Sequence, residues 1–138
     1  VKFDICYCSP LLRAKQTLEE ILKFHDGLQV IYDDRLKERD YGEITSKPAS
    51  ICKFRRWNAN DIIRFKMESI PQMFDRVANF YNEILPKQKG KNILIVSHSG
   101  TARLTHFYFA GKPSDNDYSD FSLGNAKLMM IDEKSKSK

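Results

Sequence analysis

The 138-residue sequence has few cysteines and no long apolar run. Its three cysteines, Cys6, Cys8 and Cys52, form an odd set with no second pair to complete a zinc site, so we expect reduced, buried thiols rather than disulfides or metal ligands. Apolar runs such as residues 93–96 are far shorter than the roughly 18 residues of a membrane-spanning helix, and no basic stretch followed by an apolar one opens the chain. These absences predict a cytoplasmic protein without a membrane partner.

The composition is that of one globular domain over residues 1–138, with 41% hydrophobic and 30% charged residues. The net charge of +5 is compatible with a nucleic acid, an acidic surface or a small anion as partner. Basic and aromatic residues interleave over 53–57 and 64–66, as they do in some nucleic-acid-binding proteins. Since no RRM, KH or zinc-finger signature accompanies them, we interpret both stretches as helical, with aromatic side chains inward, and expect no nucleic-acid partner.

The first third of the chain reads as strand, helix and strand. Residues 1–8 are rich in β-branched and aromatic side chains and predict a strand. Ser9 and Pro10 then supply an N-cap and a proline at the first helical position, and apolar residues at helical spacing extend this helix to about Phe24. A short strand follows over 28–32.

The rest of the chain alternates loops, helices and strands. The lack of a sustained period over 35–48 predicts a loop, and functional residues favour such loops. We further expect, in order, a broken helix over 51–65, a helix over 71–85 closed by Pro86, a strand over 93–96, a helix over 101–109 and a last strand over 126–131.

This alternation predicts an α/β fold in which helices cover both faces of a mostly parallel sheet, a three-layer α/β/α arrangement. Ligands of such sheets bind at the carboxyl ends of the strands. Two polar stretches follow predicted strands there: residues 8–10, with Arg13 close behind, and residues 97–100 around His98. We expect these stretches to meet at one edge of the sheet.

His98 and Arg13 have the chemistry of an anion site. A strand that ends at His98 and leads into a helix aims backbone N–H groups and the positive end of the helix dipole at the histidine. Arg13 lies in the first turn of the earlier helix, where the helix dipole does not favour a cation. A bound anion would explain an arginine at this place, because guanidinium binds phosphate oxygens bidentately. The alternative to an anion site is that His98 is an ordinary hydrogen-bonded histidine of the core and that Arg13 is an ordinary surface residue.

Four blocks, in order over nearly the whole chain, resemble those of the histidine phosphatases of the phosphoglycerate mutase superfamily. Residues 9–17, S-P-L-L-R-A-K-Q-T, closely match the block S-P-L-x-R-A-x-Q-T. Residues 36–42, L-K-E-R-D-Y-G, are similar to L-x-E-x-x-x-G and especially to the form L-N-E-R-H-Y-G of the mutases. Residues 67–77 resemble the looser block G-E-S-x-x-x-x-x-x-R-V, and residues 93–100 resemble the V-S-H-G block.

The resemblance implies a phosphoglycerate mutase-like fold and roles for four residues. Arg13 and His98 would hold the phosphoryl group, with Ser99 beside them among the phosphate-binding residues. Glu38 would be the general acid that protonates the leaving alkoxide and then activates water; a solvated loop carboxylate is the plain alternative. This division is chemically sound, because positioning and positive charge stabilise a phosphoryl group in transfer while an alkoxide must be protonated. The family implies no metal or organic cofactor.

The sequence contains no Arg-His-Gly block, which in the family ends the first strand and supplies the histidine that becomes phosphorylated. His25 follows a predicted helix and His106 lies inside one, so neither replaces it. We expect the nucleophile in a segment on the order of 30 residues or more upstream of Val1, with its strand in the middle of the sheet. The first strand of the family fold is thus expected to be absent from these residues. Smaller departures are Ser99, where the family commonly has glycine, and residues 44–45, where many phosphatases have an acidic residue and glycine.

These features favour a phosphomonoester hydrolase that acts through a phosphohistidine on a small phosphorylated substrate. The mutase-like residues 38–42 keep a phosphoglycerate mutase open, and a relative that binds phosphoesters or regulates without catalysis is a third alternative. The chain between Glu38 and His98 leaves little for a lid that would exclude water, which favours the hydrolase. The specific substrate and the oligomeric state, a homodimer included, stay open.

Overall fold

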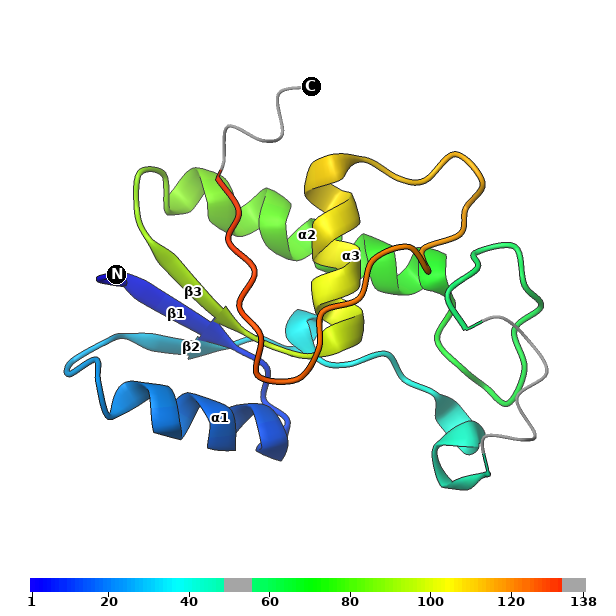
Figure 1. The fold of residues 1–138 in the computed structure, drawn as a ribbon, viewed down its shortest axis with the longest axis horizontal. Coiled ribbons are helices and arrows are strands. Elements are labelled where there is room, and N and C mark those ends of the chain that lie inside the picture. The colour runs from blue at the N-terminus through cyan, green and yellow to red at the C-terminus, as the bar shows by residue number, and fades with distance from the viewer. Residues whose placement is uncertain (49–55, 133–138) are drawn as a thin grey trace.

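The computed structural model describes residues 1–48 and 56–132 of the chain. Three strands and three α-helices follow one another in this part (Figure 1). The strands are β1 (Ile5–Cys8), β2 (Val30–Tyr32) and β3 (Ile93–Val96), and the helices are α1 (Leu12–Leu22), α2 (Ile70–Lys87) and α3 (Ser99–Ala110).

The described strands form one parallel sheet in the order β2-β1-β3. Cys8 at the end of β1 pairs with Tyr32 on one side and with Val96 on the other. Parallel neighbours need crossover connections, and α1 lies between β1 and β2 in the chain while α2 precedes β3. All three strands therefore end at the same edge, as predicted for this α/β fold.

Helices cover both faces of the sheet, which confirms the three-layer arrangement (Figure 1). Alternate residues of β1 point to opposite faces: Ile5 and Tyr7 join the core with α2 and α3, whereas Cys6 and Cys8 pack with α1. Burial raises the pKa of the Cys6 thiol to about 12 and that of the Cys8 thiol to about 11, in line with the expected reduced, buried cysteines. Cys52 lies outside the described residues.

Helix α1 begins later than the sequence indicates. The predicted N-cap, Ser9, is wrong: the N-cap is Leu11, and the helix runs from Leu12. Ser9 is completely buried, and its hydroxyl accepts a hydrogen bond from the Leu11 N–H at 3.3 Å. Ser9 therefore turns the chain at the end of β1 instead of capping the helix.

Helix α2 is a long amphipathic helix that begins with a capping box. Ser69 accepts a hydrogen bond from the Gln72 N–H, and the Gln72 side chain accepts one from the Ser69 N–H. The predicted helix over 71–85 is confirmed. Pro86, which was expected to close the helix, instead lies inside its last turn, where few backbone hydrogen bonds remain to be lost. None of the described helices is both long and apolar enough to cross a membrane.

The loop after β2, predicted over 35–48, contains two short 3-10 helices, Asp34–Leu36 and Gly42–Ser46. Gly42 has a φ of 54°, and a Cβ at this position would collide with the backbone oxygen of Phe65. Only glycine accepts this conformation and this close approach.

The strand predicted over 126–131 is wrong, because the structure has no strand there. The side chains of Leu128 and Met130 are 73% and 81% exposed, so the segment has no apolar face against which it packs. A strand also needs a neighbour that pairs its backbone groups, and the described strands pair only with one another.

The broken helix predicted over 51–65 is partly outside the described residues, which exclude 51–55. The remaining stretch, 56–65, forms turns and an isolated bridge rather than a helix, so the prediction is wrong there. Phe65 and Lys66 have φ angles of 58° and 56°, which a right-handed helix does not allow.

Candidate active site

The carboxyl ends of β1 and β3 bring Ser9 and His98 together. The Ser9 N–H donates a hydrogen bond to the Val96 carbonyl at 2.9 Å, which holds the two strand ends side by side. The Ser9 hydroxyl lies 2.8 Å from His98 Nε2. His98 is the N-cap residue of α3, and its carbonyl accepts the Ala102 N–H at 2.8 Å. The two polar stretches thus lie at one edge of the sheet, as the sequence predicts.

Arg13 is the second residue of α1, and its side chain is exposed. Burial lowers the pKa of His98, the positive charge of Arg13 lowers it further, and the charge of Glu38 raises it. The charge of Arg13 therefore reaches the imidazole, and the charged form of His98 is disfavoured. An anion bound between them would relieve the repulsion and favour the charged imidazolium.

Glu38 reaches the start of α3 from the loop after β2. Its Oε2 accepts the Gly100 N–H at 3.1 Å, and its Oε1 accepts the Arg39 N–H at 2.8 Å. The N-terminal end of a helix favours a negatively charged group. A Cβ on Gly100 would collide with Glu38 Oε1, so only glycine lets the carboxyl approach this closely. Glu38 and His98 consequently share the N-terminal end of α3.

Two helices hold the backbone that carries Glu38. The guanidinium of Arg76 in α2 donates hydrogen bonds to the carbonyls of Lys37 and Glu38 at 2.9 and 3.2 Å. The same guanidinium pairs with the Glu68 carboxylate, with Nε 2.6 Å from Oε1. From α3, the buried Thr101 hydroxyl donates to the Lys37 carbonyl at 3.0 Å. These contacts fix the position of the Glu38 backbone relative to both helices.

Ser99, the fourth predicted site residue, is the first residue of α3 and is exposed. Within the described part of the chain, its hydroxyl makes no hydrogen bond. The structure therefore brings Arg13, Glu38 and His98 together and leaves Ser99 at the rim, beside His98.

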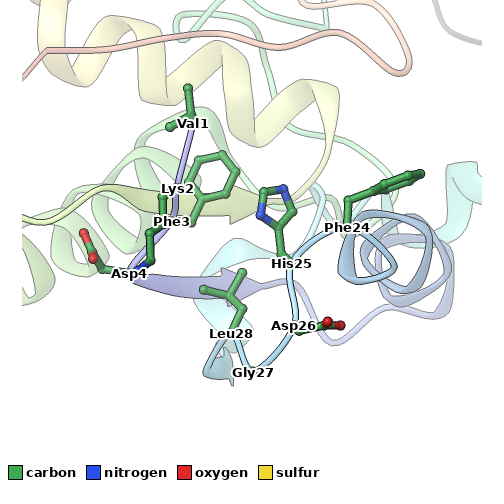
Figure 2. Close-up of a pocket in the computed structure, with 9 residues that line it drawn as sticks. All are labelled: Val1, Lys2, Phe3, Asp4, Phe24, His25, Asp26, Gly27 and Leu28. Atoms are coloured by element: carbon green, nitrogen blue, oxygen red, sulfur yellow. The ribbon is translucent and has the colours of Figure 1, made fainter.

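The other two histidines lie away from this edge. Figure 2 shows His25 among the residues that line a pocket at the amino ends of β1 and β2. The pocket has a volume of about 530 Å³, and the ring centroids of His25 and Phe3 are 5.1 Å apart. His106 lies about two turns further along α3 than His98 and stacks on Phe121 at 4.1 Å. That neither of them is the nucleophile stays a prediction.

A cluster of guanidinium and aromatic groups beside Glu38 is not evident from the sequence patterns. We call it the arginine–aromatic cluster; its members are Arg39, Tyr41, Arg56, Trp57 and Arg103. The guanidinium carbons of Arg103 and Arg39 lie 4.5 and 5.3 Å from the centroid of the Trp57 ring. The alternation of basic and aromatic residues at 56–57 is a sequence signal for this cluster. The same alternation also fits a helix surface, which is how we interpret it from the sequence.

The groups that this edge offers to a phosphate are guanidinium, imidazole and the N–H groups of a helix start. Among residues 1–48 and 56–132, no three His, Cys, Asp or Glu side chains are grouped so as to hold a metal ion. A hollow of about 650 Å³ borders Glu38 on the side of α2, and its lining mixes the basic Lys37, Lys66 and Arg76 with the acidic Asp34, Asp40 and Glu68. The charges of this hollow therefore do not favour an anion, and the groups suited to bind one next to Glu38 are those of Arg13, His98 and the start of α3.

The family model of the histidine phosphatase superfamily (branch 1) matches residues 1–138. The chain belongs to this superfamily, and its fold is phosphoglycerate mutase-like.

Curated relatives include both mutases and phosphatases. A 2,3-bisphosphoglycerate-dependent phosphoglycerate mutase of Rhizobium etli is 32% identical over 116 residues, which cover 75% of this chain and 55% of the relative. A Bacillus subtilis protein named "Uncharacterized phosphatase PhoE" is 30% identical over 130 residues, which cover 94% of this chain and 64% of the relative. The chain thus spans between about half and two thirds of the length of these relatives.

Solved structures with the same fold include two that are named as phosphatases. The alpha-ribazole phosphatase from Shigella flexneri superposes with a TM-score of 0.70 at 25% identity, over 90% of this chain and 64% of that chain. The mycobacterial glucosyl-3-phosphoglycerate phosphatase superposes with a TM-score of 0.69 at 20% identity, over 88% of this chain and 64% of that chain, and shows the fold alone.

Proposed function

We propose that this chain is the phosphate-binding and proton-donating part of a phosphomonoester hydrolase that acts through a phosphohistidine. The nucleophilic histidine comes from a segment upstream of Val1, and the substrate is a small phosphorylated molecule. The observation that carries the proposal is the convergence of Arg13, Glu38 and His98 at the carboxyl edge of β1 and β3. Membership of the superfamily and a relative named as a phosphatase support it.

In the first half-reaction, the upstream histidine nitrogen forms a bond to phosphorus while the bond from phosphorus to the ester oxygen breaks. Arg13 and His98 bind the non-bridging oxygens, whose charge must be stabilised throughout the transfer. Glu38 in its protonated form gives its proton to the departing alkoxide. The alcohol leaves neutral, and Glu38 becomes a carboxylate.

In the second half-reaction, water replaces the histidine on phosphorus. The Glu38 carboxylate takes a proton from the attacking water, and the phosphorus–nitrogen bond breaks. The products are inorganic phosphate and the free histidine, with Glu38 protonated again. The hydrogen bond from the Gly100 N–H keeps Glu38 Oε2 at the start of α3, where it serves both steps.

Turnover of p-nitrophenyl phosphate tests the proposal when the full-length protein is compared with the 138 residues alone. We expect turnover by the longer protein and little or none by the shorter one, because covalent catalysis without its nucleophile loses the step that divides the barrier. Robust turnover by the 138 residues would contradict an upstream nucleophile. A full-length protein that hydrolyses no phosphomonoester would contradict the hydrolase itself.

A phosphoglycerate mutase is a second candidate, favoured by the mutase-like residues 38–42 and by the Rhizobium etli relative. A mutase must keep water from the phosphohistidine while the intermediate reorients, which requires additional structure over the site. The short stretch between Glu38 and His98 offers little of it, so we favour the hydrolase.

Supplying 3-phosphoglycerate with catalytic 2,3-bisphosphoglycerate separates the candidates. We expect the full-length protein to release phosphate faster than it forms 2-phosphoglycerate. Isomer formation that outpaces phosphate release would identify a mutase. Binding of the phosphoesters without either product would favour a non-catalytic relative.

A further inference from the structure

We propose that the ion pair of Arg76 and Glu68 positions Glu38 for proton transfer. Neither member of the pair touches the reacting atoms; both act through the loop that carries Glu38, and so determine how fast a leaving group that needs a proton departs. This inference rests on the proposed function and adds positioning residues to its proton donor.

Arg76 in α2 and Glu68, just before this helix, form a two-point ion pair. Arg76 Nε lies 2.6 Å from Glu68 Oε1, and Arg76 Nη2 lies 3.0 Å from Glu68 Oε2. The two side chains are only 21% and 16% exposed. A bidentate pair fixes the plane of the guanidinium as well as its distance from the carboxylate. The remaining donors of Arg76 are therefore held in a fixed direction.

These donors bind the backbone immediately before Glu38 and at Glu38 itself. Arg76 Nη1 donates to the carbonyls of Arg35 and Lys37 at 2.8 and 2.9 Å. Arg76 Nη2 donates to the carbonyl of Glu38 at 3.2 Å. One planar guanidinium thus fixes the path of the chain over residues 35–38, which the three donors of a lysine ammonium, with no fixed plane, would not reproduce.

Glu68 binds the backbone and side chain of the residues after Glu38. The Glu68 N–H donates to the Asp40 carbonyl at 2.8 Å, and Glu68 Oε2 accepts the Asp40 N–H at 3.2 Å. The Glu68 carbonyl accepts a hydrogen bond from Arg39 Nε at 2.9 Å. The chain is therefore tied to the pair on both sides of Glu38, whose carboxyl oxygens accept the N–H groups of Arg39 and Gly100.

The position of Glu38 matters for one step more than for phosphate binding. A general acid must meet the leaving oxygen at hydrogen-bond distance, and a displacement of about 1 Å is enough to slow such a step roughly 100-fold. Arg13 and His98 come from α1 and from the start of α3, and the hydrogen bonds of the pair described above do not involve them. Loss of the pair should therefore impair proton transfer and leave phosphate binding largely intact.

The test compares kcat of the full-length protein for glycerol 3-phosphate, an alkyl ester, and for p-nitrophenyl phosphate, an aryl ester. We expect Arg76→Met to lower the ratio of the alkyl to the aryl value roughly 10- to 100-fold, with little change in KM. Arg76→Lys keeps the charge but not the planar set of donors and should lower the ratio less. Glu83→Gln is the matched control, because it removes a carboxylate that pairs with Arg35 from two turns further along α2, and should leave the ratio unchanged.

A double-mutant cycle distinguishes positioning of Glu38 from a general effect on the fold. A merely structural role would lower both rates together, whether or not the proton donor is present. In a Glu38→Gln background we expect Arg76→Met to lower the ratio no further, since the proton donor is already lost. An unchanged ratio in folded Arg76→Met or, if that variant does not fold, in Arg76→Lys would overturn the proposal. An equal further drop in the Glu38→Gln background would overturn it as well.

A protein that hydrolyses neither ester would contradict the proposed function but would still test the pair through His98. Burial lowers the pKa of His98 most, and the charge of Glu38 raises it. Glu38→Gln should therefore lower this pKa further, as measured by NMR. The drop should be smaller in an Arg76→Met or Arg76→Lys background, where the carboxyl is displaced, and full in a Glu83→Gln background. No drop in the wild type, or a drop of the same size in the folded Arg76 variants, would overturn the proposal.

Discussion

Ser9 and His98, 89 positions apart in the sequence, lie 2.8 Å apart at the ends of two adjacent parallel strands. Ser9 is completely buried, so its hydroxyl holds the imidazole from the protein side. Burial and the charge of Arg13 disfavour the imidazolium form of His98. A histidine whose positive charge is disfavoured, beside an arginine and at the N-terminal end of a helix, is an arrangement that a bound anion would stabilise.

We expect the pKa of His98 to lie below its ordinary value of 6.5 in the free protein and to rise when phosphate binds. The bound negative charge offsets the effects of burial and of Arg13 on the imidazolium. Titration of the imidazole signals by NMR, with and without phosphate, measures both values, and His98→Asn assigns them. A pKa that phosphate leaves unchanged would place the anion elsewhere.

The same shift gives the stability of the fold a pH dependence. The folded state binds the His98 proton more weakly than the unfolded state, so this contribution is complete above the unfolded pKa of 6.5 and is lost as the pH falls through the folded-state pKa. Denaturant unfolding on both sides of this window should show a smaller acid-induced loss in His98→Asn than in the wild type.

Arg13→Ala should weaken the binding of phosphate or vanadate to the full-length protein by about 1.5 to 3 kcal/mol, the contribution of a charge-assisted hydrogen bond. Lys23→Ala is the matched control, because it removes an exposed cation beyond the other end of α1. Calorimetric titration measures both, together with His98→Ala. Unchanged affinity in Arg13→Ala and His98→Ala would refute the pocket.

Glu38→Gln should impair hydrolysis of alkyl phosphates far more than that of aryl phosphates. An alkoxide needs a full proton from Glu38, whereas p-nitrophenolate leaves with little protonation. The glutamine keeps the shape of the side chain and a carbonyl oxygen for the Gly100 N–H. Steady-state kinetics on glycerol 3-phosphate and p-nitrophenyl phosphate make the comparison, and an equal loss on both would assign Glu38 a structural role.

Gly100→Ala should displace the Glu38 carboxyl and reproduce the selective loss on alkyl phosphates, by about tenfold or more. The new methyl group would collide with Glu38 Oε1 and lie 2.7 Å from Trp57 Cη2. Gly124→Ala is the control, since a Cβ there meets only Lys127 Cγ at an ordinary 3.6 Å. Wild-type kinetics in Gly100→Ala would mean that Glu38 does not work from the position seen here.

The spacing of apolar residues predicted β3 and α2, because in both the residues of the element itself determine which side chains are buried. The apolar run of β3 and the helical spacing of α2 specify a buried strand and an amphipathic helix, and both are present. The strand expected over 126–131 has the right composition, but a strand depends on a neighbour that local sequence does not reveal. Ser9 has the right chemistry for an N-cap, yet the contact with His98 at 2.8 Å places its hydroxyl elsewhere.

The sequence nominates a candidate site residue where a family block marks it, as for Arg13, Glu38 and His98, and their roles stay predictions. The placement of Arg103 against Trp57 was not predictable, because these residues are far apart in the chain and meet only through the loops around α3. Neither periodicity nor a local motif records such a contact, since both describe neighbours in the sequence.

The central claim is that this site turns over a phosphomonoester through a phosphohistidine, and trapping the phosphoenzyme tests it most directly. The full-length protein is mixed with a radiolabelled aryl phosphate and quenched within one turnover. We predict label on a histidine of the protein, labile to acid and stable to alkali, which a chase converts to inorganic phosphate. Glu38→Gln should accumulate more of this label, because the aryl group leaves without its proton while the attack of water is slowed. Hydrolysis that proceeds with no label on the protein, or with label on a residue other than histidine, would contradict the account.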